Sequence, residues 1–354
     1  MDIQLNLVPT ADRKPIPTQL AFGQNFTDHM FRQKYTAEVG WHAAEIGPYE
    51  PITLDPAALV FHYAQEIFEG TKAYRTPDGH VNLFRPWENA KRFNFSAERM
   101  SMATVDVEDH VLAIAKLVET DQAWVPSADG SSLYIRPTMI ATEAGIGVKA
   151  SHSYLHFIIT CPVGNYYPQG MSAVPVFISD EYRRAVKGGT GAAKTGGNYA
   201  ASLYVSEQVK QKGYVQVLWL DAVTGRYIEE VGTMNIMFVY EGKKVVTPAL
   251  TGSILAGITR DSLLRLAPDL GYEVAEELLE VEQVLADIQS GKITEAFGCG
   301  TAVVVSPVGK FGYKGQDYTV GDGQVGPVAS HLYKALTDIQ YGRVPDPYGW
   351  IHTI

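Results

Sequence analysis

The residue best suited to covalent chemistry in this chain is a lysine that stands among glycines. Lys194 lies in the segment 187–199, which holds five glycines in thirteen residues. Glycine lets the backbone approach a ligand closely, and a lysine amine becomes a nucleophile when burial or a nearby cation lowers its pKa. The segment has three interpretations: an exposed flexible loop, a phosphate-binding loop, or the site of a lysine that forms a Schiff base with an aldehyde.

The spacing of the glycines tests the second interpretation. Residues 188–195 nearly match the phosphate-loop pattern G-x-x-x-x-G-K-[ST]. Ala193, however, stands where the last glycine is required. A charged stretch also separates the loop from the predicted strand at 174–178, whereas a phosphate-binding loop follows its strand directly. The pattern therefore disfavours a nucleotide-binding phosphotransferase and leaves the Schiff-base lysine as the stronger chemical interpretation.

A Schiff-base lysine is typical of a pyridoxal phosphate site, which also needs an acid for the pyridine nitrogen, donors for the phosphate and a group for the ring hydroxyl. Glu229 and Glu230 end a predicted strand and point in opposite directions, so one of them can face a cleft. Residues 253–260 lead into a predicted helix whose first N–H groups suit a phosphate, although an ordinary threonine N-cap also explains this segment. Residues 295–302 either offer N–H groups in the same way or form a tight turn. The candidate phosphate-binding cations, each of which could also lie on the surface, are Arg85, Lys91 and Arg92.

The elements that must position these residues mix strands and helices in the first half and are richer in strands in the second. Turn residues between apolar runs predict several hairpins. Strands are predicted at 70–75, 80–84, 132–140, 154–160, 174–178, 214–220, 226–230, 235–240 and 245–247. Helices are predicted at 87–96, 107–120, from about 198 onwards, at 259–267 and at 281–289. Runs of strands broken by a few helices indicate an α+β fold more than a strict βαβ alternation.

The chain is long enough for two domains, since 354 residues exceed what one core usually supports. The best boundary is the stretch 162–170, where two prolines and two glycines interrupt regular structure. The sequence therefore predicts an N-terminal domain at 1–164, an interdomain loop at 165–175 and a second domain at 176–354. Two adjacent tyrosines in the loop suggest that it also lines a cleft.

Charge and composition exclude several classes of partner. The formal net charge of −10 argues against nonspecific binding to nucleic acid or to an anionic membrane. No apolar run is long enough to span a membrane, and residues 1–15 lack the pattern of a secretory or transit peptide, so a cytoplasmic protein is expected. Cys161 and Cys299, the two cysteines, form neither a disulfide framework nor a metal-binding cluster, and no metal site is predicted.

Taken together, these residues resemble the branched-chain amino-acid aminotransferases, which belong to the fold-type IV pyridoxal phosphate enzymes. The matching stretches follow one another through nearly the whole chain at 26–30, 68–73, 134–137, 161–164, 194–199, 230–235, 300–302 and 336–342. The resemblance implies an α+β, two-domain (α/β) fold, with a small N-terminal α/β domain and a larger C-terminal, β-rich pseudo-barrel domain that binds pyridoxal 5'-phosphate.

The resemblance also implies a role for each cofactor-binding residue. Lys194 would form the Schiff base with the cofactor and move the proton between substrate and cofactor. Glu230 would pair with the pyridine nitrogen, and Tyr199 would hydrogen-bond the ring hydroxyl. The remaining cofactor-binding residues would be Arg92, Ile258, Thr259 and Thr301, all at the phosphate, and Thr233.

A second set of residues resembles the family's substrate pocket. Its apolar and aromatic walls would be formed by Tyr63, Phe68, Tyr134 and Tyr166. Arg136 would receive the side-chain carboxylate of glutamate, and the amides of Thr301 and Ala302 would bind the α-carboxylate. A mostly apolar pocket with one charged contact at its rim can accept both a branched apolar side chain and glutamate.

The reaction that the resemblance implies is reversible transfer of the amino group of L-leucine, L-isoleucine or L-valine to 2-oxoglutarate, which gives branched 2-oxo acids and L-glutamate. The expected partners are these small molecules and a second copy of the chain in a homodimer. Within the same fold type, a D-amino-acid transaminase or an aminodeoxychorismate lyase is the alternative. A non-catalytic sensor of the cofactor or of an amino acid is a further alternative from another class, as is the phosphotransferase described above.

Overall fold

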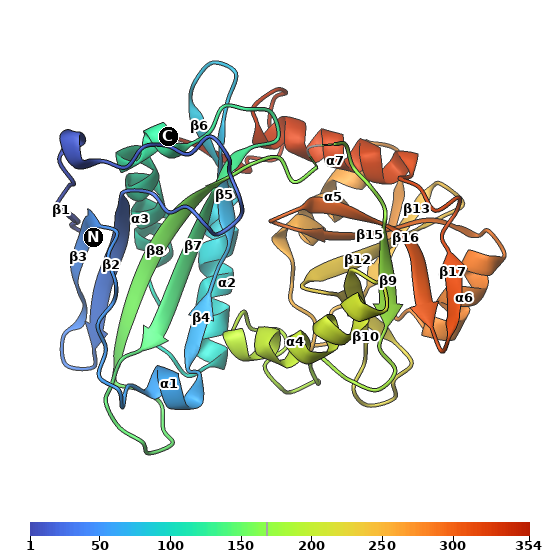
Figure 1. Ribbon diagram of the computed structural model, residues 1–354, viewed down its shortest axis with the longest axis horizontal. Coiled ribbons are helices and arrows are strands. Elements are labelled where there is room, and N and C mark those ends of the chain that lie inside the picture. The colour runs from blue at the N-terminus through green and yellow to red at the C-terminus, as the bar shows by residue number, and fades with distance from the viewer. Residues whose placement is uncertain (168) are drawn as a thin grey trace. The chain divides into compact units, whose positions relative to one another are not determined.

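The computed structural model describes residues 1–167 and 169–354, which divide into two units (Figure 1). The first, here called the N-terminal unit, contains Met1–Pro168, Ala193–Gly196 and Asp338–Ile354. The second, called the C-terminal unit, contains Gln169–Ala192 and Gly197–Thr337. Within the predicted interdomain loop 165–175, Pro168 lies outside the described residues.

The domain limits at 164 and 176 stay a prediction. The two units differ from the predicted domains in the place of two later segments. The sequence analysis assigned all of 176–354 to the second domain, whereas Ala193–Gly196 and Asp338–Ile354 have their contacts in the N-terminal unit. Strand pairing explains the terminal segment, because β18 (Ile351–Thr353) pairs antiparallel with β6 (Val81–Phe84). With these two segments the N-terminal unit holds more residues than the C-terminal unit.

The N-terminal unit contains one mainly antiparallel sheet. Its strand order is β1-β3-β2-β8-β7-β5-β6-β18, and β4 pairs with β7. The strands not yet given are β1 (Gln4–Leu5), β2 (His29–Thr36), β3 (Gly40–Pro48), β4 (Glu66–Phe68), β5 (Thr71–Arg75), β7 (Ser132–Ala141) and β8 (Ser153–Val163). The helices are α1 (Leu59–Tyr63), α2 (Pro86–Arg99) and α3 (Val107–Thr120), with 3-10 turns at Thr10–Asp12 and Gln122–Trp124.

Helix α3 is capped at its N-terminus and packs on the sheet. Its N-cap residue Asp106 accepts a hydrogen bond from the backbone N–H of Asp109, which satisfies one of the donors that a helix start leaves open. Ile114 and Leu117 are fully buried and belong to the same apolar cluster as Phe31 of β2. Burying each such side chain stabilises the unit by about 1.5–3 kcal/mol.

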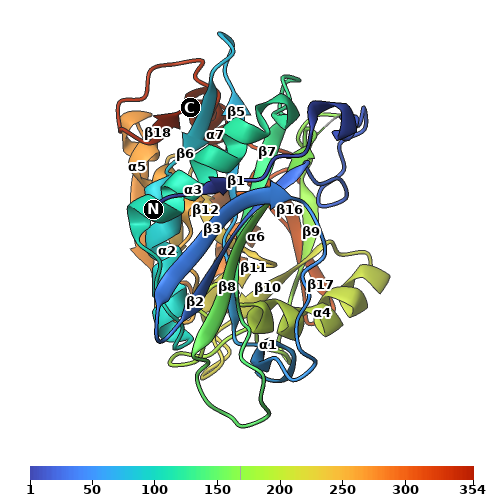
Figure 2. The same cartoon turned by 90° about the vertical axis from the view of Figure 1, so that its left-hand side faces the viewer.

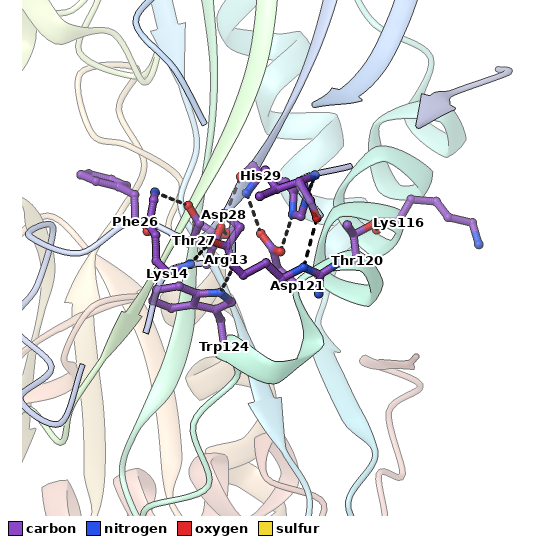
Figure 3. Close-up of polar contacts among 12 residues, drawn as sticks. Arg13, Lys14, Phe26, Thr27, Asp28, His29, Lys116, Thr120, Asp121 and Trp124 are labelled. Carbon is purple, nitrogen blue, oxygen red and sulfur yellow. Dashed lines mark hydrogen bonds and ion pairs between the residues drawn. The ribbon is translucent and has the colours of Figure 1, made fainter. Parts of the chain in front are cut away.

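The start of β2 is held by buried polar contacts (Figure 3). Nδ1 of His29 lies 2.6 Å from Oδ1 of Asp121, which follows α3. Asp28 accepts a hydrogen bond of 2.8 Å from the indole N–H of Trp124. The backbone N–H of Val8 donates to Nε2 of His29 over 2.9 Å, so Nδ1 is the nitrogen that carries the proton. These contacts tie the N-terminal segment, β2 and the end of α3 to one another.

The C-terminal unit contains a closed barrel. The sheet order β11-β10-β9-β16-β15-β12 is closed by the pairing of β11 with β12, and the sheet continues from β12 to β13 and β14, while β17 pairs with β16. The first five strands are β9 (Val174–Ile178), β10 (Gln216–Leu220), β11 (Ile228–Val231), β12 (Met234–Tyr240) and β13 (Lys244–Pro248). The others are β14 (Glu273–Glu277), β15 (Ile293–Gly300), β16 (Val304–Tyr313) and β17 (Gln316–Thr319). The predicted β-rich barrel is therefore confirmed.

Helices accompany the barrel strands in the sequence. They are α4 (Gly196–Gln211), α5 (Ile258–Asp269), α6 (Val281–Gln289) and α7 (Pro327–Gln340). Residues of the barrel strands, such as Leu218 and Phe238, form one buried apolar cluster with Val284 and Leu285 of α6. No helix of the described residues is long and apolar enough to cross a membrane. Figure 2 shows the same fold from the side of the N-terminal sheet.

Candidate active site

Lys194 is fixed in the N-terminal unit by its own backbone. Its N–H donates to Oγ of Ser96 on α2 over 2.9 Å, and its carbonyl accepts from the N–H of Phe68 over 3.0 Å. Nζ lies 4.8 Å from the centre of the Phe68 ring. Although the side chain is partly exposed, the pKa of Lys194 is lowered to about 8, first by burial of the amine and then by the charge of Arg92, while Glu69 opposes the shift. Roughly a tenth of this amine is therefore uncharged near neutral pH, and the uncharged form is the one that a nucleophile requires.

The residues after Lys194 are held by Glu66. Oγ1 of Thr195 donates to the backbone carbonyl of Glu66 over 2.7 Å, and the N–H of Gly196 donates to the Glu66 carboxylate. A Cβ atom at position 196 would overlap that carboxylate, so the Glu66 side chain would have to shift to admit a larger residue there. Burial raises the pKa of Glu66, and the bonds from Gly196 and Thr195 partly offset the rise. This glycine serves close packing rather than a phosphate loop.

Among the three candidate cations, Arg92 is the one whose charge lowers the pKa of Lys194. Its Nε and Nη2 donate to the two oxygens of Glu69 over 2.7 and 2.9 Å. Lys91 instead lies on the surface and pairs with Glu88. Arg85 stands at the N-cap of α2, where its backbone has a positive φ of 49° and its guanidinium lies against Trp350. All three side chains are cations that lie close together in the sequence, and only the folded structure shows that their surroundings differ.

Phe68, Tyr134 and Arg136 come together in the N-terminal unit. The Arg136 guanidinium lies 4.7 Å from the centre of the Phe68 ring and 5.3 Å from that of Tyr134. Its Nη2 donates to the Tyr134 hydroxyl over 3.1 Å. Nε of Arg136 is buried and has no hydrogen-bond partner within 1–167 and 169–354. A buried guanidinium N–H without a partner suits a carboxylate ligand.

Two other predicted pocket residues are not joined to this group by any contact described for them. Tyr63 ends α1 and its hydroxyl donates to the carbonyl of Ile146. Tyr166 is 57% exposed and stacks edge-on against Tyr167 in the predicted interdomain loop. Their place in the substrate pocket stays a prediction.

Glu230 lines a pocket of the C-terminal unit together with Tyr199 and Thr233. The Glu230 carboxylate forms a buried ion pair with Arg184, and Nδ2 of Asn235 lies 3.4 Å from its Oε1. The sequence analysis did not single out Arg184 as a site residue. Its guanidinium also donates to the backbone carbonyl of Gly191 over 3.1 Å, and thus holds the loop before the lysine.

Glu229 points away from that pocket, as strand alternation predicts for one of the two glutamates. Its carboxylate accepts a hydrogen bond from Oγ of Ser253, and burial raises its pKa. The carbonyl of Ser253 in turn accepts a hydrogen bond of 2.6 Å from Arg184. The adjacent carboxylates Glu229 and Glu230 therefore have different surroundings, and Glu230 is the one that lines the small pocket.

The start of α5 lies beside the end of β11. Gly257, not a threonine, is the N-cap of the helix, and no side chain caps it. The first N–H groups of a helix, here those of Ile258 and Thr259, have no partner within the helix itself. Asn235 connects this end to Glu230, because its Nδ2 also donates to the carbonyl of Leu255 over 2.9 Å. An anion at this helix start would meet N–H donors and the positive end of the helix dipole.

Thr301 and Ala302 form the turn between β15 and β16, where Gly300 pairs with Val304. This segment therefore forms a tight turn, and anion binding by its N–H groups stays a prediction. The strand register also brings the turn near Glu230, because Glu230 pairs with Asn235 and Asn235 pairs with Cys299. The carboxylate, the start of α5 and this turn therefore gather at one end of the barrel.

The other residues that sequence reasoning missed are Glu66, Glu69 and Asn235. Glu69 lies within the matching stretch 68–73 and Asn235 within 230–235, but neither was given a role. The two cysteines are free and buried, and burial raises the pKa of Cys299 to about 12. Among the described residues, no group of three or more His, Cys, Asp and Glu side chains could hold a metal ion.

Most of the chain matches a known enzyme family. The chain belongs to the class IV aminotransferases, since residues 66–311 match the family described as "Amino-transferase class IV". It is 52% identical to "Branched-chain-amino-acid transaminase 1" of Bacillus subtilis (strain 168) over 338 residues, which cover 95% of each chain. It is 49% identical to "Probable branched-chain-amino-acid aminotransferase" of Streptomyces coelicolor over 97% of this chain and 95% of the relative.

Solved structures agree with this family. The branched-chain amino acid aminotransferase of Escherichia coli superposes with a TM-score of 0.75 at 27% identity, over 92% of this chain and 98% of that chain. The T.th. branched-chain amino acid aminotransferase with pyridoxamine 5'-phosphate also has a TM-score of 0.75 at 27% identity, over 90% and 97% of the two chains. The predicted family and the predicted fold class are both confirmed.

Proposed function

We propose that this protein is a branched-chain amino-acid transaminase that uses pyridoxal 5'-phosphate. It transfers the amino group of L-leucine, L-isoleucine or L-valine to 2-oxoglutarate, and the reaction is reversible. The observation that carries the proposal is the buried Lys194 amine, whose pKa is lowered to about 8, beside the ring of Phe68. The names of relatives that are 47–52% identical over 95–98% of this chain support the choice of substrate.

The donor set of the chain fits this cofactor. When bound, pyridoxal phosphate supplies an aldehyde that reacts with amines and a ring that withdraws electrons from the carbon next to the amino group. A buried lysine with a lowered pKa suits the aldehyde, and a buried carboxylate that lines a pocket suits the ring nitrogen. An anion such as the phosphate suits N–H groups at a helix start.

These residues would share the work of holding the cofactor and moving protons. Lys194 would hold the aldehyde carbon through Nζ and would move the proton that leaves Cα of the amino acid. Glu230 would hold the proton on the ring nitrogen, and Tyr199 would orient the ring through its hydroxyl. The remaining cofactor contacts that we propose are Arg92, Ile258, Thr259 and Thr301 at the phosphate, and Thr233.

The substrate residues divide by chemistry. Phe68 and Tyr134, with Tyr63 and Tyr166, supply aromatic surface for a branched side chain, whose burial is favourable because it removes apolar area from water. Arg136 binds the side-chain carboxylate of glutamate, and its buried Nε supports this role. The amides of Thr301 and Ala302 bind the α-carboxylate.

The absorption spectrum of the purified protein tests the proposal. A protein that holds pyridoxal phosphate on Lys194 absorbs visible light, and this absorption changes when L-leucine is added. The Lys194→Ala variant is expected to lose both the covalently held cofactor and transamination. The Lys91→Ala variant, which removes an exposed lysine, should behave like the wild type. A Lys194→Ala protein that transaminates at the wild-type rate would contradict the proposal.

A substrate screen separates the proposal from other enzymes of the same fold type. Turnover of D-alanine without turnover of L-leucine would favour a D-amino-acid transaminase. Release of pyruvate from aminodeoxychorismate would favour the lyase. We also propose that the protein forms a homodimer, which light scattering of the purified protein can test. A cytoplasmic location and domain limits at 164 and 176 are part of the same proposal.

A further inference from the structure

Glu69 is a fully buried carboxylate whose charge acts on the Lys194 amine, and no role has been assigned to it so far. Its side chain is inaccessible to solvent. Both of its oxygens accept hydrogen bonds from Arg92, and Oε2 also accepts from Nδ2 of Asn89 over 2.8 Å and from the N–H of Gly70 over 3.1 Å. All these residues, with Lys194, belong to the N-terminal unit.

Stability alone does not explain such a pair. Taking two charges out of water costs about as much as their attraction returns, so an apolar pair of similar size is often equally stable. Here Arg92 and Glu69 are nearly completely buried, with 11% and 0% of their side chains exposed. A buried ion pair next to a nucleophilic amine therefore points to a role in the site itself.

The geometry of the pair fixes the Arg92 guanidinium. Two parallel bonds from Nε and Nη2 to one carboxylate define the plane of this rigid, planar group. Asn89 lies one turn before Arg92 on α2 and donates to Oε2 of the same carboxylate. The carboxylate is thus itself fixed by a helix and by the backbone of Gly70.

The charges of the pair act on Lys194 in opposite directions. Burial lowers the pKa of Lys194 most, Arg92 lowers it as well, and Glu69 raises it. The pKa of Glu69 is itself lowered, because the charge and hydrogen bonds of Arg92 and the charge of Lys194 outweigh the effect of burial. The other groups that act on the amine are Tyr134 and Arg136 of β7.

We propose that Glu69 is a positioning residue of this site: it holds Arg92 in the plane that binds the cofactor phosphate, and its negative charge keeps the positive charge of Arg92 from acting alone on Lys194. This inference rests on the proposed function, because it requires a phosphorylated aldehyde at Lys194.

Binding of two aldehydes to the protein stripped of cofactor tests the first part. Pyridoxal 5'-phosphate and pyridoxal differ only in the phosphate, so the ratio of their dissociation constants measures the phosphate contact. We expect Glu69→Gln to reduce the preference for the phosphorylated form by about tenfold, the size of one misplaced charge-assisted bond. A purely structural loss would weaken both aldehydes alike, and that result would overturn the proposal.

The pH dependence of pyridoxal capture tests the second part, because only the uncharged amine reacts. Glu69 raises the pKa of Lys194, so Glu69→Gln should move the midpoint of capture to lower pH. Arg92→Gln should move it to higher pH, and the double variant should return it towards the wild type. A midpoint that stays in place or rises in Glu69→Gln would contradict the electrostatic role.

Control variants keep both tests interpretable. Glu295→Gln removes a buried carboxylate that accepts hydrogen bonds from the N–H groups of Val328 and Ala329 in the C-terminal unit, so it should leave the ratio and the midpoint unchanged. If Glu69→Gln fails to fold, Glu69→Asp keeps the charge and should keep the midpoint while it reduces the ratio; a reduced midpoint there would contradict the proposal. Wild-type protein that captures neither aldehyde on Lys194 would instead refute the proposed function.

Discussion

At the scale of single residues, Arg136 shows how one side chain can serve two substrates. Its guanidinium lies 4.7 Å from the centre of the Phe68 ring and 5.3 Å from that of the Tyr134 ring. Its buried Nε has no partner in the described part of the chain. A branched side chain can therefore pack on the rings, while a carboxylate gains a charge-assisted bond to the guanidinium.

This setting predicts a selective effect of Arg136→Met. The hydrogen bond of a charged group contributes about 1.5–3 kcal/mol, so we expect the KM for 2-oxoglutarate to rise roughly 10- to 100-fold. The KM for L-leucine should change by less than about threefold, since the apolar surface is kept. Half-reactions with 2-oxoglutarate, starting from the aminated cofactor, and with L-leucine, starting from the aldehyde form, measure the two effects separately when they are followed by absorption. Equal losses for both substrates would show that Arg136 acts through the fold.

At the scale of elements, α3 packs on the sheet through two buried imidazoles. The ring of His110 on α3 stacks on that of His156 on β8 at 5.0 Å with an angle of 15°, and Phe93 of α2 contacts both. Burial lowers the pKa of His110 to about 4, and burial also lowers that of His156, with a further effect of His110. The folded unit therefore requires both rings to be neutral.

The stacked rings predict that acid destabilises the protein over a defined range. The unfolded chain binds a proton at His110 near pH 6.5, but the folded chain does so only near pH 4. The stability from this group is therefore complete above pH 6.5 and is lost as the pH falls towards 4. Urea unfolding should show that His110→Leu loses about 2 kcal/mol less than the wild type between pH 7 and pH 5. His80→Gln, at an exposed histidine, should lose as much as the wild type, and equal losses in His110→Leu would contradict this account.

Local patterns in the sequence predicted many helices and strands, but they did not predict which elements pack or pair with one another. Helix α3 was predicted at its observed bounds, and the structure adds that Asp106 caps it. Helix α7 was not predicted, although Val328, Leu332 and Leu336 are buried at helical spacing. Strands β2 and β3 were also missed, because their burial pattern alternates only in part.

The site shows the same division between local and distant information. The lysine, the glutamate and the helix start were recognisable because each lies in a short stretch with its own chemistry. Arg184, however, acquires its role from an ion pair with Glu230, and Glu69 from one with Arg92. Such pairs depend on strand order and on helix packing, which no local pattern specifies.

At the scale of the whole molecule, the chain does not divide into units at a single point. Ala193–Gly196 interrupts the C-terminal unit in the sequence and Asp338–Ile354 follows it, but both segments belong to the N-terminal unit. β18 supplies the edge strand next to β6, and the carbonyl of Lys194 accepts the N–H of Phe68. The N-terminal unit is therefore incomplete without residues from the last third of the chain.

This arrangement predicts the behaviour of a split protein. A fragment of residues 1–168 lacks β18 and the lysine segment, so we expect it to be poorly folded when it is produced alone. Produced together with a fragment of residues 169–354, it should form a complex that co-purifies. Circular dichroism and pull-down measure the two outcomes. A fragment 1–168 that unfolds cooperatively alone and does not bind the second fragment would contradict the prediction.

The bond between Val8 and His29 has a consequence for the first residues of the chain. Because Nε2 accepts the Val8 N–H, this hydrogen bond forms only in the tautomer that is protonated at Nδ1. A doubly protonated ring would place one N–H against another and break this hydrogen bond. Trimming the chain past Val8 would likewise leave a buried acceptor unsatisfied at the start of β2, so an added leader is better tolerated at this end than a deletion.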